Sequence, residues 1–386
     1  MIPYGKQEIT KTDIDAVVKV LNSDFLTQGP VVPQFEKIVA EYCNVEHTVA
    51  VNSATSALHI ACLALGLGKG DYLWTSPNTF VASANCGLYC GAKIGFIDID
   101  HKTYNISSQA LEEKLVQAEK NGKLPKVVIP VHFAGQACEM EKIHQLSKKY
   151  GFKIIEDASH AIGGKYQNRQ IGSCLYGDIT IFSFHPVKII TTGEGGMAST
   201  NSPVLAEKMR LLRSHGVTRD ARLMTKQSEG AWYYQQIDLG FNYRMTDIQA
   251  ALGISQMRRI DQFIKHRHEI QQRYDKQLAQ LPVVTAPLQT KETYSSLHLY
   301  PIQINYDVIS KTRNQVFDEM RKSNIGVNVH YIPVHTQPYY QSLGFKQGDF
   351  PNAENYYSRA MSLPIFSSMT SSQQDDVVSA LHKVLM

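Results

Sequence analysis

The sequence predicts an α/β protein with a large domain built on a mostly parallel sheet and a smaller α+β domain after it. Short apolar runs alternate with helical stretches from residue 47 to residue 214, and this alternation is typical of parallel sheets covered by helices. The alternation then gives way to a long helical stretch at residues 245–281. We therefore expect a large domain at residues 1–260, with an N-terminal helical segment, and a small C-terminal domain at residues 261–386.

The first elements are two expected helices. Residues 11–22 have the apolar spacing of a helix, and residues 33–43 begin with Pro33, which suits a first helical turn. Residues 47–67 then indicate a strand, a turn of small hydroxyl residues and a helix. The alternation continues with strands expected at 93–99, 126–131, 153–157, 179–184 and 195–200, and with helices expected at 107–119, 139–150 and 203–214.

The C-terminal part follows a different pattern. The helical stretch 245–281 has one soft break near Asp261 and could link the two domains. Residues 217–236 have no clear periodicity, so we expect a long surface loop there. The small domain is predicted to contain strands at 299–305 and 326–332 and helices at 310–323, 352–361 and 371–385.

Composition excludes several classes of protein. The net charge is +4 and charged residues make up 19% of the chain, which gives little support to a nucleic-acid or membrane-surface binder. No apolar run approaches the ~18 residues of a membrane span, and the first residues lack a signal-peptide pattern. Cys86 and Cys90 could share a helix face, but no second pair completes a zinc site. We expect no metal, and six buried, reduced cysteines in a cytoplasmic protein.

Asp157 is the first candidate for chemistry. It closes the apolar strand of "KIIED" and is followed by small residues. Ligands of parallel sheets bind beyond the carboxyl ends of the strands. An aspartate in this position is equally suited to cap a following helix.

A second candidate is the stretch "NSATS" at residues 52–56, between a predicted strand and a predicted helix. Free N–H groups at a helix start, with hydroxyls beside them, hold phosphate. The alternative is a simple helix cap. No GxxxxGK[ST] or GxGxxG motif is present, so neither a Walker loop nor a dinucleotide site is indicated.

The third candidate is Lys188 in "SFHPVKIITTGEGG". A lysine becomes a Schiff-base nucleophile when desolvation lowers its pKa, although a lone lysine is more often structural. The order of a phosphate cup, Asp157 and then a lysine 31 residues later fits a pyridoxal phosphate site. Ser183 would help to hold the phosphate, and Phe80 is the candidate to cover the cofactor ring.

These motifs together resemble the fold-type I sugar aminotransferases of the DegT/DnrJ/EryC1/StrS family. The likeness runs from Tyr4 to the C-terminus through "NSATSAL", "EDASHAIG", "SFHPVK", "TTGEGG", "RSHG", "GFNYRMTDIQAALG" and "HYIPVH". The resemblance implies an aspartate aminotransferase-like fold with a seven-stranded sheet, pyridoxal 5'-phosphate as cofactor, and a homodimer with shared active sites.

A narrower resemblance, to the aminotransferases of pseudaminic acid biosynthesis, rests on "LNSDFLTQGPVVPQFE", "SSLHLYPI" and "VHYIPVHTQPYY". It implies conversion of UDP-2-acetamido-2,6-dideoxy-β-L-arabino-hex-4-ulose to UDP-4-amino-4,6-dideoxy-N-acetyl-β-L-altrosamine, with L-glutamate as amino donor. Three alternatives remain: an aminotransferase of another 4-keto nucleotide sugar, a related dehydrating lyase, and a non-catalytic regulator. Lyases of the family carry histidine in place of the lysine, so Lys188 argues against a lyase.

The resemblance also implies roles for individual residues. Lys188 would be the Schiff-base lysine and Asp157 the partner of the pyridine nitrogen, while His160 would lie beside the cofactor's O3′. Phe80 would stack on the ring. The phosphate would be held by Ala54, Thr55, Ser183 and, from the partner subunit, Asn242. The sugar-nucleotide pocket would be lined by Tyr4, Asp24, Phe25, Leu26, Thr27, Ala54, Ser183, Asn242, Val329, His330, Tyr331 and Ile332, with His215 and His335 as weaker candidates.

Overall fold

A seven-stranded sheet forms the centre of the computed structural model, which describes all 386 residues. Its strand order is β1-β9-β8-β5-β4-β2-β3. Neighbouring strands from β8 to β3 are parallel, whereas β9 runs antiparallel to both β1 and β8. This confirms the mostly parallel sheet. The strands are β1 (His47–Val51), β2 (Tyr72–Thr75), β3 (Lys93–Phe96), β4 (Val127–Ile129), β5 (Lys153–Asp157), β8 (Ile179–Ser183) and β9 (Gly196–Thr200).

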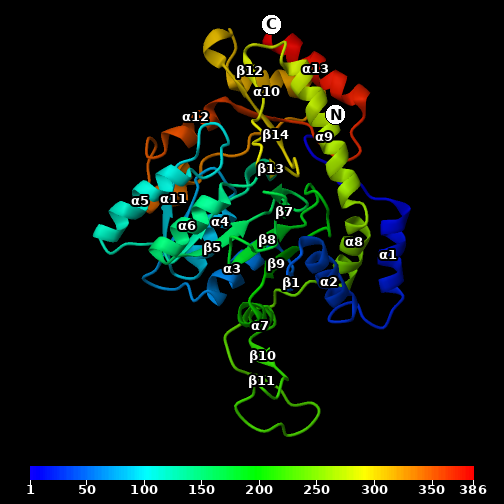
Figure 1. The fold of residues 1–386 in the computed structure, drawn as a ribbon. Coiled ribbons are helices and arrows are strands. Elements are labelled where there is room, and N and C mark those ends of the chain that lie inside the picture. Colours follow the sequence, from blue (N-terminus) through cyan, green and yellow to red (C-terminus); the bar gives the residue numbers. More distant parts are fainter.

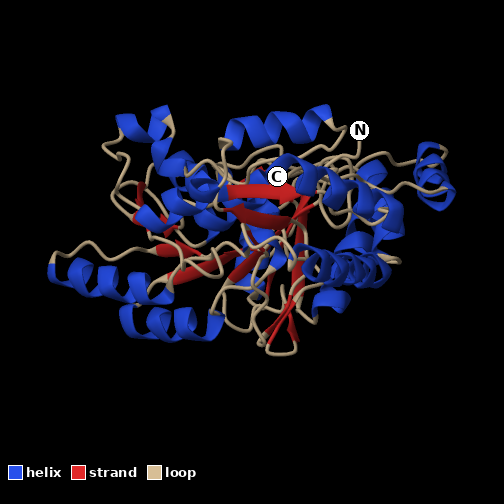
Figure 2. Cartoon of the chain, turned by 90° about the horizontal axis from the view of Figure 1, so that it is seen from above, coloured by secondary structure: helices blue, strands red, loops and turns tan.

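Helices cover both faces of this sheet (Figures 1 and 2). All five residues of β8 and all five of β9 are buried, as expected for strands between two helical layers. One apolar core lies on the side of α2 and α8, and another on the side of α3 and α7. The helices of this part are α1 (Lys11–Leu21), α2 (Val31–Cys43), α3 (Ala54–Ala64), α4 (Ala82–Tyr89), α5 (Ser108–Lys120), α6 (Met140–Tyr150), α7 (Pro203–Leu212) and α8 (Asp247–Met257).

The chain after α8 builds its own core around a three-stranded sheet in the order β12-β14-β15. The expected soft break near Asp261 lies at residues 258–259, between α8 and α9. The division of the chain into domains at residue 260 stays a prediction. The elements are α9 (Ile260–Leu278), β12 (Val284–Thr285), β14 (Tyr300–Ile304), α10 (Arg313–Lys322), α11 (Pro338–Ser342), α12 (Pro351–Arg359), β15 (Ala360–Leu363) and α13 (Ser371–Leu385).

The predicted strand at residues 326–332 is wrong. Only single bridges form there, such as Asn328 with Ser362, and the third strand of the small sheet is β15. The alternating sequence "VNVHY" imitates a strand, but the side chains of Asn328, Val329, His330 and Tyr331 line a cavity. Strand β2 and helix α4 were not predicted: α4, "ASANCGLY", consists mostly of small residues that form no distinct apolar face, and β2 has only four residues.

Residues 217–236 form an arm that projects from the body next to α7 (Figure 1). Short strands β10 (Val217–Thr218) and β11 (Gln235–Gln236) pair at its base. Trp232 is 72% exposed, and Leu239, just beyond the arm, is 74% exposed. The predicted surface loop is therefore a hairpin arm with large apolar side chains at its surface. A separate small sheet contains β6 (Lys165–Tyr166), β7 (Arg169–Gln170) and β13 (Thr293–Tyr294).

None of the helices combines the length and the apolar character that crossing a bilayer requires. All six cysteines are free thiols; Cys90 and Cys174 are partly exposed and the other four are buried.

Candidate active site

A cavity of about 570 Å³ opens at the carboxyl edge of the seven-stranded sheet. Strands β1, β5 and β8 end at this edge, because they are parallel, and β9 starts there. Eleven of the predicted site residues meet in its wall although they are spread over the chain. They are Tyr4, Ala54, Thr55, Phe80, Asp157, His160, Ser183, Lys188, Val329, His330 and Tyr331.

The Asp157 carboxylate is held in place at the end of β5. Its Oδ2 accepts a hydrogen bond from the Ser83 hydroxyl on α4 at 2.6 Å, and its Oδ1 accepts one from the backbone N–H of Ser159 at 3.1 Å. No helix begins after Asp157, so the alternative reading as a helix cap does not apply. Asp157 is 5% exposed and forms no ion pair, although the Lys188 charge is close enough to interact with it. A buried carboxylate without an ion pair is costly, so this group suits a ligand with a positive charge or an acidic N–H.

Lys188 is held in a loop, residues 184–195, that joins β8 to its antiparallel neighbour β9. Its ammonium group makes no hydrogen bond or ion pair with the chain, and the next residues, Ile189 and Ile190, are buried. Desolvation lowers the pKa of Lys188 to about 8, and the nearby Asp157 charge partly opposes this shift. A larger share of neutral amine is therefore available near pH 7 than on an ordinary lysine.

The start of α3 forms the predicted cup. Ser53 caps the helix by accepting a hydrogen bond from the N–H of Ser56 at 3.2 Å, so the cap and the cup are compatible. The N–H groups of Ala54 and Thr55 in the first turn are not bonded by the helix and line the cavity beside Ser183. β9 begins against this turn: a Cβ on Gly196 would lie 2.5 Å from the Ala54 nitrogen. The cup is suited to an anion such as phosphate.

His160 connects the end of β5 to the segment that carries Tyr331. Its Nδ1 accepts the backbone N–H of Ala134 at 3.3 Å, and its Nε2 lies 3.0 Å from the Tyr331 hydroxyl. Burial lowers the pKa of His160 well below its usual 6.5, with the Lys188 and His330 charges as further causes. The ring is thus neutral at pH 7, and because Nδ1 accepts, the proton is on Nε2 and is donated to Tyr331.

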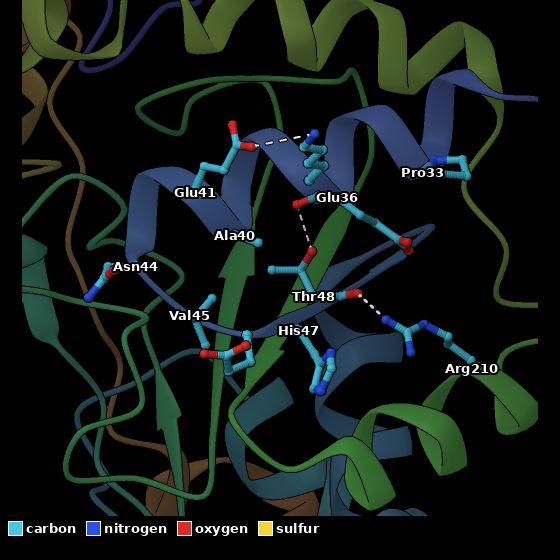
Figure 3. Close-up of a pocket in the computed structure, with 11 residues that line it drawn as sticks. Pro33, Glu36, Ala40, Glu41, Asn44, Val45, His47, Thr48 and Arg210 are labelled. Carbon is cyan, nitrogen blue, oxygen red and sulfur yellow. Dashed lines mark hydrogen bonds and ion pairs between the residues drawn. The ribbon is translucent and has the colours of Figure 1, made fainter.

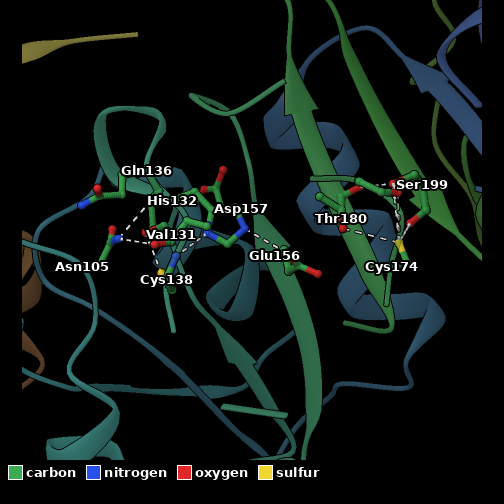
Figure 4. A network of polar contacts seen from close by, with 12 residues as sticks. Asn105, Val131, His132, Gln136, Cys138, Glu156, Asp157, Cys174, Thr180 and Ser199 are labelled. Atoms are coloured by element: carbon green, nitrogen blue, oxygen red, sulfur yellow. Dashed lines mark hydrogen bonds and ion pairs between the residues drawn. The ribbon is translucent and has the colours of Figure 1, made fainter. Parts of the chain in front are cut away.

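A polar network beneath Asp157 fixes the loop that carries Ala134 (Figure 4). His132 accepts the N–H of Cys138 at Nδ1, so its Nε2–H donates to the buried Glu156 carboxylate at 2.9 Å. The side-chain amide of Asn105 bonds this loop through both its oxygen and its nitrogen. The oxygen accepts from the N–H of Phe133, and the nitrogen donates to the carbonyls of residues 136 and 137. These bonds stabilise the position of His160 indirectly.

Several cavity residues were missed by the sequence analysis. Ser83 fixes Asp157, and Asn328 donates to Nε2 of His330 at 3.3 Å. His298 lies in the wall against His160, with ring centroids 4.4 Å apart. Its segment, "SSLHLYPI", carried a resemblance but no chemical pattern. The further lining residues are Ser53, Leu58, Thr79, Ala82, Val131, Ser159, His185, Val187 and Glu194.

The remaining predicted residues lie outside this cavity. The segment Asp24, Phe25, Leu26 and Thr27 is exposed, as are Asn242 and His215. Ile332 is 48% exposed and lines a different pocket. His335 is fully buried and bonds Glu354 on α12 at 2.8 Å, which is a structural position.

A second cavity, of about 480 Å³, lies between α2, the start of β1 and α7 (Figure 3). None of the predicted site residues lines it. Several of its charged groups are already engaged: Lys37 pairs with Glu41, and Arg210 donates to the carbonyl oxygen of Thr48 at 3.3 Å. The first cavity is therefore the stronger candidate for chemistry.

The residues of the first cavity fit pyridoxal phosphate. The unbonded N–H groups of Ala54 and Thr55 match a phosphate, the uncompensated carboxylate of Asp157 matches a protonated pyridine nitrogen, and the unpartnered amine of Lys188 matches the aldehyde. Phe80, 60% exposed at the cavity wall, is free to cover a bound ring.

Comparison with known proteins gives a consistent result. The profile of the DegT/DnrJ/EryC1/StrS aminotransferase family matches residues 7–382. The spore coat polysaccharide biosynthesis protein SpsC of Bacillus subtilis is 41% identical over all of this chain and 97% of its own length. A UDP-4-amino-4,6-dideoxy-N-acetyl-beta-L-altrosamine transaminase of Campylobacter jejuni is 38% identical over all of this chain and 98% of its own length.

Solved structures agree in fold. Helicobacter pylori PseC, an aminotransferase involved in the biosynthesis of pseudoaminic acid, superposes with a TM-score of 0.91 at 32% identity, over all of this chain and 99% of that chain. Solved relatives include forms with pyridoxal phosphate and with pyridoxamine phosphate.

Proposed function

The chain belongs to the DegT/DnrJ/EryC1/StrS aminotransferase family, and on that premise we propose that its substrate is a 4-keto sugar nucleotide of pseudaminic acid biosynthesis. The protein is a pyridoxal phosphate-dependent sugar aminotransferase. The proposed reaction turns UDP-2-acetamido-2,6-dideoxy-β-L-arabino-hex-4-ulose into UDP-4-amino-4,6-dideoxy-N-acetyl-β-L-altrosamine, with L-glutamate as donor. The names of the Campylobacter and Helicobacter relatives support this choice.

The arrangement of Lys188 and Asp157 in one cavity carries the proposal. Lys188 has a pKa of about 8 and no hydrogen-bond partner, and Asp157 is fixed by Ser83; the two charges are close enough to interact but form no ion pair. Both groups are expensive to desolvate. A non-catalytic regulator with this fold would have no need to maintain them.

The residues of the cavity divide the work of transamination. Pyridoxal phosphate, when bound, supplies an electron sink that lets a proton leave the α-carbon of the amino acid. Asp157 would hold a proton on the pyridine nitrogen and so keep that sink effective. The neutral amine of Lys188 would take the α-proton as general base, and the ammonium group so formed would return the proton as general acid. His160 and Tyr331, which are joined by a hydrogen bond, would hold the phenolic side of the cofactor.

One lysine serves both half-reactions. The amino donor enters first and leaves as its keto acid, and the 4-keto sugar then enters the same cavity and accepts the amino group. Because Lys188 is the only lysine that lines the cavity, the same amine moves the proton in both directions. Steady-state kinetics are therefore expected to be ping-pong.

We propose that two chains share each site in a homodimer. Two sets of the predicted residues that the cavity lacks lie near α8: the N–H of Asp247 donates to the carbonyl of Leu26 at 3.0 Å, and Thr27 bridges to Thr246. Asn242 is exposed and lies shortly before Thr246 in the chain. One surface region could thus supply all of these residues to the cavity of a second copy.

A second candidate is an aminotransferase of a different 4-keto nucleotide sugar. The similarity to B. subtilis SpsC, at 41% identity, favours it, because that relative is named for polysaccharide biosynthesis. The active-site chemistry would be the same, and only the sugar that the pocket accepts would differ.

The test is an assay with two 4-keto UDP-sugars, the β-L-arabino ketone and its ring epimer. Each is supplied with L-glutamate, and the product is identified by NMR. We expect turnover of the β-L-arabino ketone and formation of the altrosamine product. Preference for the other epimer would replace the proposed substrate with the second candidate.

A further inference from the structure

His298 is a buried histidine of the cavity wall for which the reaction described above has no role. It precedes β14, is 4% exposed, and lines the cavity. Its side chain makes no hydrogen bond, and its Nδ1 is buried without a partner. The two other buried histidines of the wall, His160 and His330, each use both ring nitrogens.

The missing partner of Nδ1 determines which nitrogen of His298 carries the proton. Burial lowers the pKa of His298 well below 6.5, with the charges of Lys188, His160, Arg267 and His330 as further causes, so the ring is neutral at pH 7. A buried N–H without an acceptor costs more than an unpaired lone pair. The proton is therefore on Nε2, which is left as a hydrogen-bond donor for a ligand in the cavity.

A buried cation stands behind this histidine. Arg267, on α9, is 1% exposed and donates to the carbonyl oxygens of Leu297 at 3.0 Å and of His298 at 3.3 Å. No carboxylate pairs with Arg267 anywhere in the chain, and its Nε has no partner. Arg267 thus fixes the backbone of His298 and leaves a positive potential that favours an anion on the cavity side.

The position of His298 matches one group of the amino donor. The α-carboxylate is bonded to the carbon whose proton Lys188 moves, so it must lie close to the Lys188 amine. His298 contacts His160 and is close enough to Lys188 for the lysine charge to shift its pKa. No arginine lines the cavity, although arginine is the side chain most often used for carboxylates.

We propose that His298, held in place by Arg267, receives the α-carboxylate of the amino donor through its Nε2–H. This rests on the proposed function for the identity of the donor. A neutral imidazole suits a cavity that must accept two different substrates in turn. It donates to a carboxylate in the first half-reaction and to an uncharged sugar oxygen in the second, and it leaves no unpaired charge in the cavity when the carboxylate has gone.

The experiment compares His298→Leu, His298→Gln and the wild-type holoenzyme in single half-reactions. The cofactor spectrum is followed after rapid mixing with L-glutamate alone, and separately, from the aminated enzyme, with the 4-keto sugar. We expect His298→Leu to raise the apparent Kd for L-glutamate about tenfold to a hundredfold and to change the sugar Kd less than about threefold. His298→Gln, which keeps an N–H donor, should recover part of the loss.

His268→Ala is the matched control. His268 bonds the carbonyl of Ser295 at 2.8 Å from outside the cavity, so its removal disturbs the same segment without removing a cavity donor. An unchanged glutamate Kd in His298→Leu, an equal weakening of both half-reactions, or an equal effect of His268→Ala would overturn the proposal. If the wild-type enzyme itself fails to react with L-glutamate, the proposed donor is wrong; if only the sugar half fails, the proposed sugar is wrong and the donor comparison still stands.

Discussion

At the scale of single residues, the two groups that matter most are stabilised by opposite means. Asp157 is surrounded by donors, from the Ser83 hydroxyl and the Ser159 N–H. Lys188 has no hydrogen-bond acceptor, and desolvation lowers its pKa to about 8 although the residue is only partly buried. The first arrangement fixes the carboxylate in place, and the second favours a neutral amine.

Replacing Lys188 by alanine should abolish transamination. The variant loses both the covalent anchor and the group that moves the proton, and general acid–base catalysis alone contributes about 10²–10⁴-fold. We expect at least that loss in kcat and the disappearance of the visible band of the lysine-bound cofactor. Turnover near that of the wild-type enzyme would remove Lys188 from its role.

The lowered pKa of Lys188 predicts how cofactor capture depends on pH. Burial moves this pKa from 10.5 to about 8, and only the neutral amine attacks an aldehyde. The rate at which apoenzyme takes up pyridoxal phosphate should therefore rise with pH and level off above about 8. Nα-acetyllysine is the reference, since its rate should still be rising near pH 10. A plateau for the enzyme at that higher pH would contradict the prediction.

At the scale of elements, the site depends on where β9 starts relative to α3. Because β9 is the one strand that runs against its neighbours, its first residue, Gly196, meets the first turn of α3. A side chain at Gly196 would meet the backbone of Ser53 and Ala54 at about 2.5 Å. The cup therefore requires a glycine because of close approach and not because of an unusual backbone conformation.

Gly196→Ala should weaken cofactor binding as well as stability. The added methyl pushes the α3 turn away, at a cost of about 1–3 kcal/mol in the free energy of unfolding, and we expect the Kd for pyridoxal phosphate to rise about tenfold. Thermal denaturation and a cofactor titration measure the two effects. Gly68→Ala is the control, because no atom lies within 4 Å of its added Cβ; an equal loss in both variants would refute the steric explanation.

The sequence predicted the elements that hold Asp157, Ser183 and Lys188, because Asp157 and Ser183 end largely apolar strands and Lys188 follows the second of them. It did not predict α4, whose small residues form no distinct apolar face, and so Ser83 was missed. His298 was also missed, since its partners Arg267 and His160 are distant in the sequence and only folding brings them together. In residues 326–332 polar and apolar residues alternate, and this pattern predicted a strand. The structure has no strand there, because the side chains of this segment line the cavity.

At the scale of the whole molecule, the homodimer that we propose requires a surface on which two chains meet. The arm at 217–236 projects from the body (Figure 1), and Trp232 and Leu239 are largely exposed. Large apolar side chains on a projecting element are typical of a subunit contact. The homodimer that we propose would cover them.

Shared sites can be tested by complementation. In a dimer of one Lys188→Ala chain and one Asn242→Ala chain, one site carries both lesions and the other carries neither. Co-expression with two affinity tags should give heterodimers with about half of the wild-type activity per dimer, above that of either parent. Absence of rescue in purified heterodimers would mean that Asn242 acts within its own chain or outside the site.

The loop that carries Lys188 has both of its ends anchored. Ser183 pairs with Gly196, and the backbone of Phe184 bonds those of Gly195 and Thr192. The two ends of the loop at residues 184–195 are therefore held together. When a substrate takes the place of the lysine, the amine can retreat only by the length of its own side chain. Its local concentration at the reaction centre therefore stays far above that of any amine in solution. The loop would thus keep the Lys188 amine within reach of a bound cofactor throughout each half-reaction.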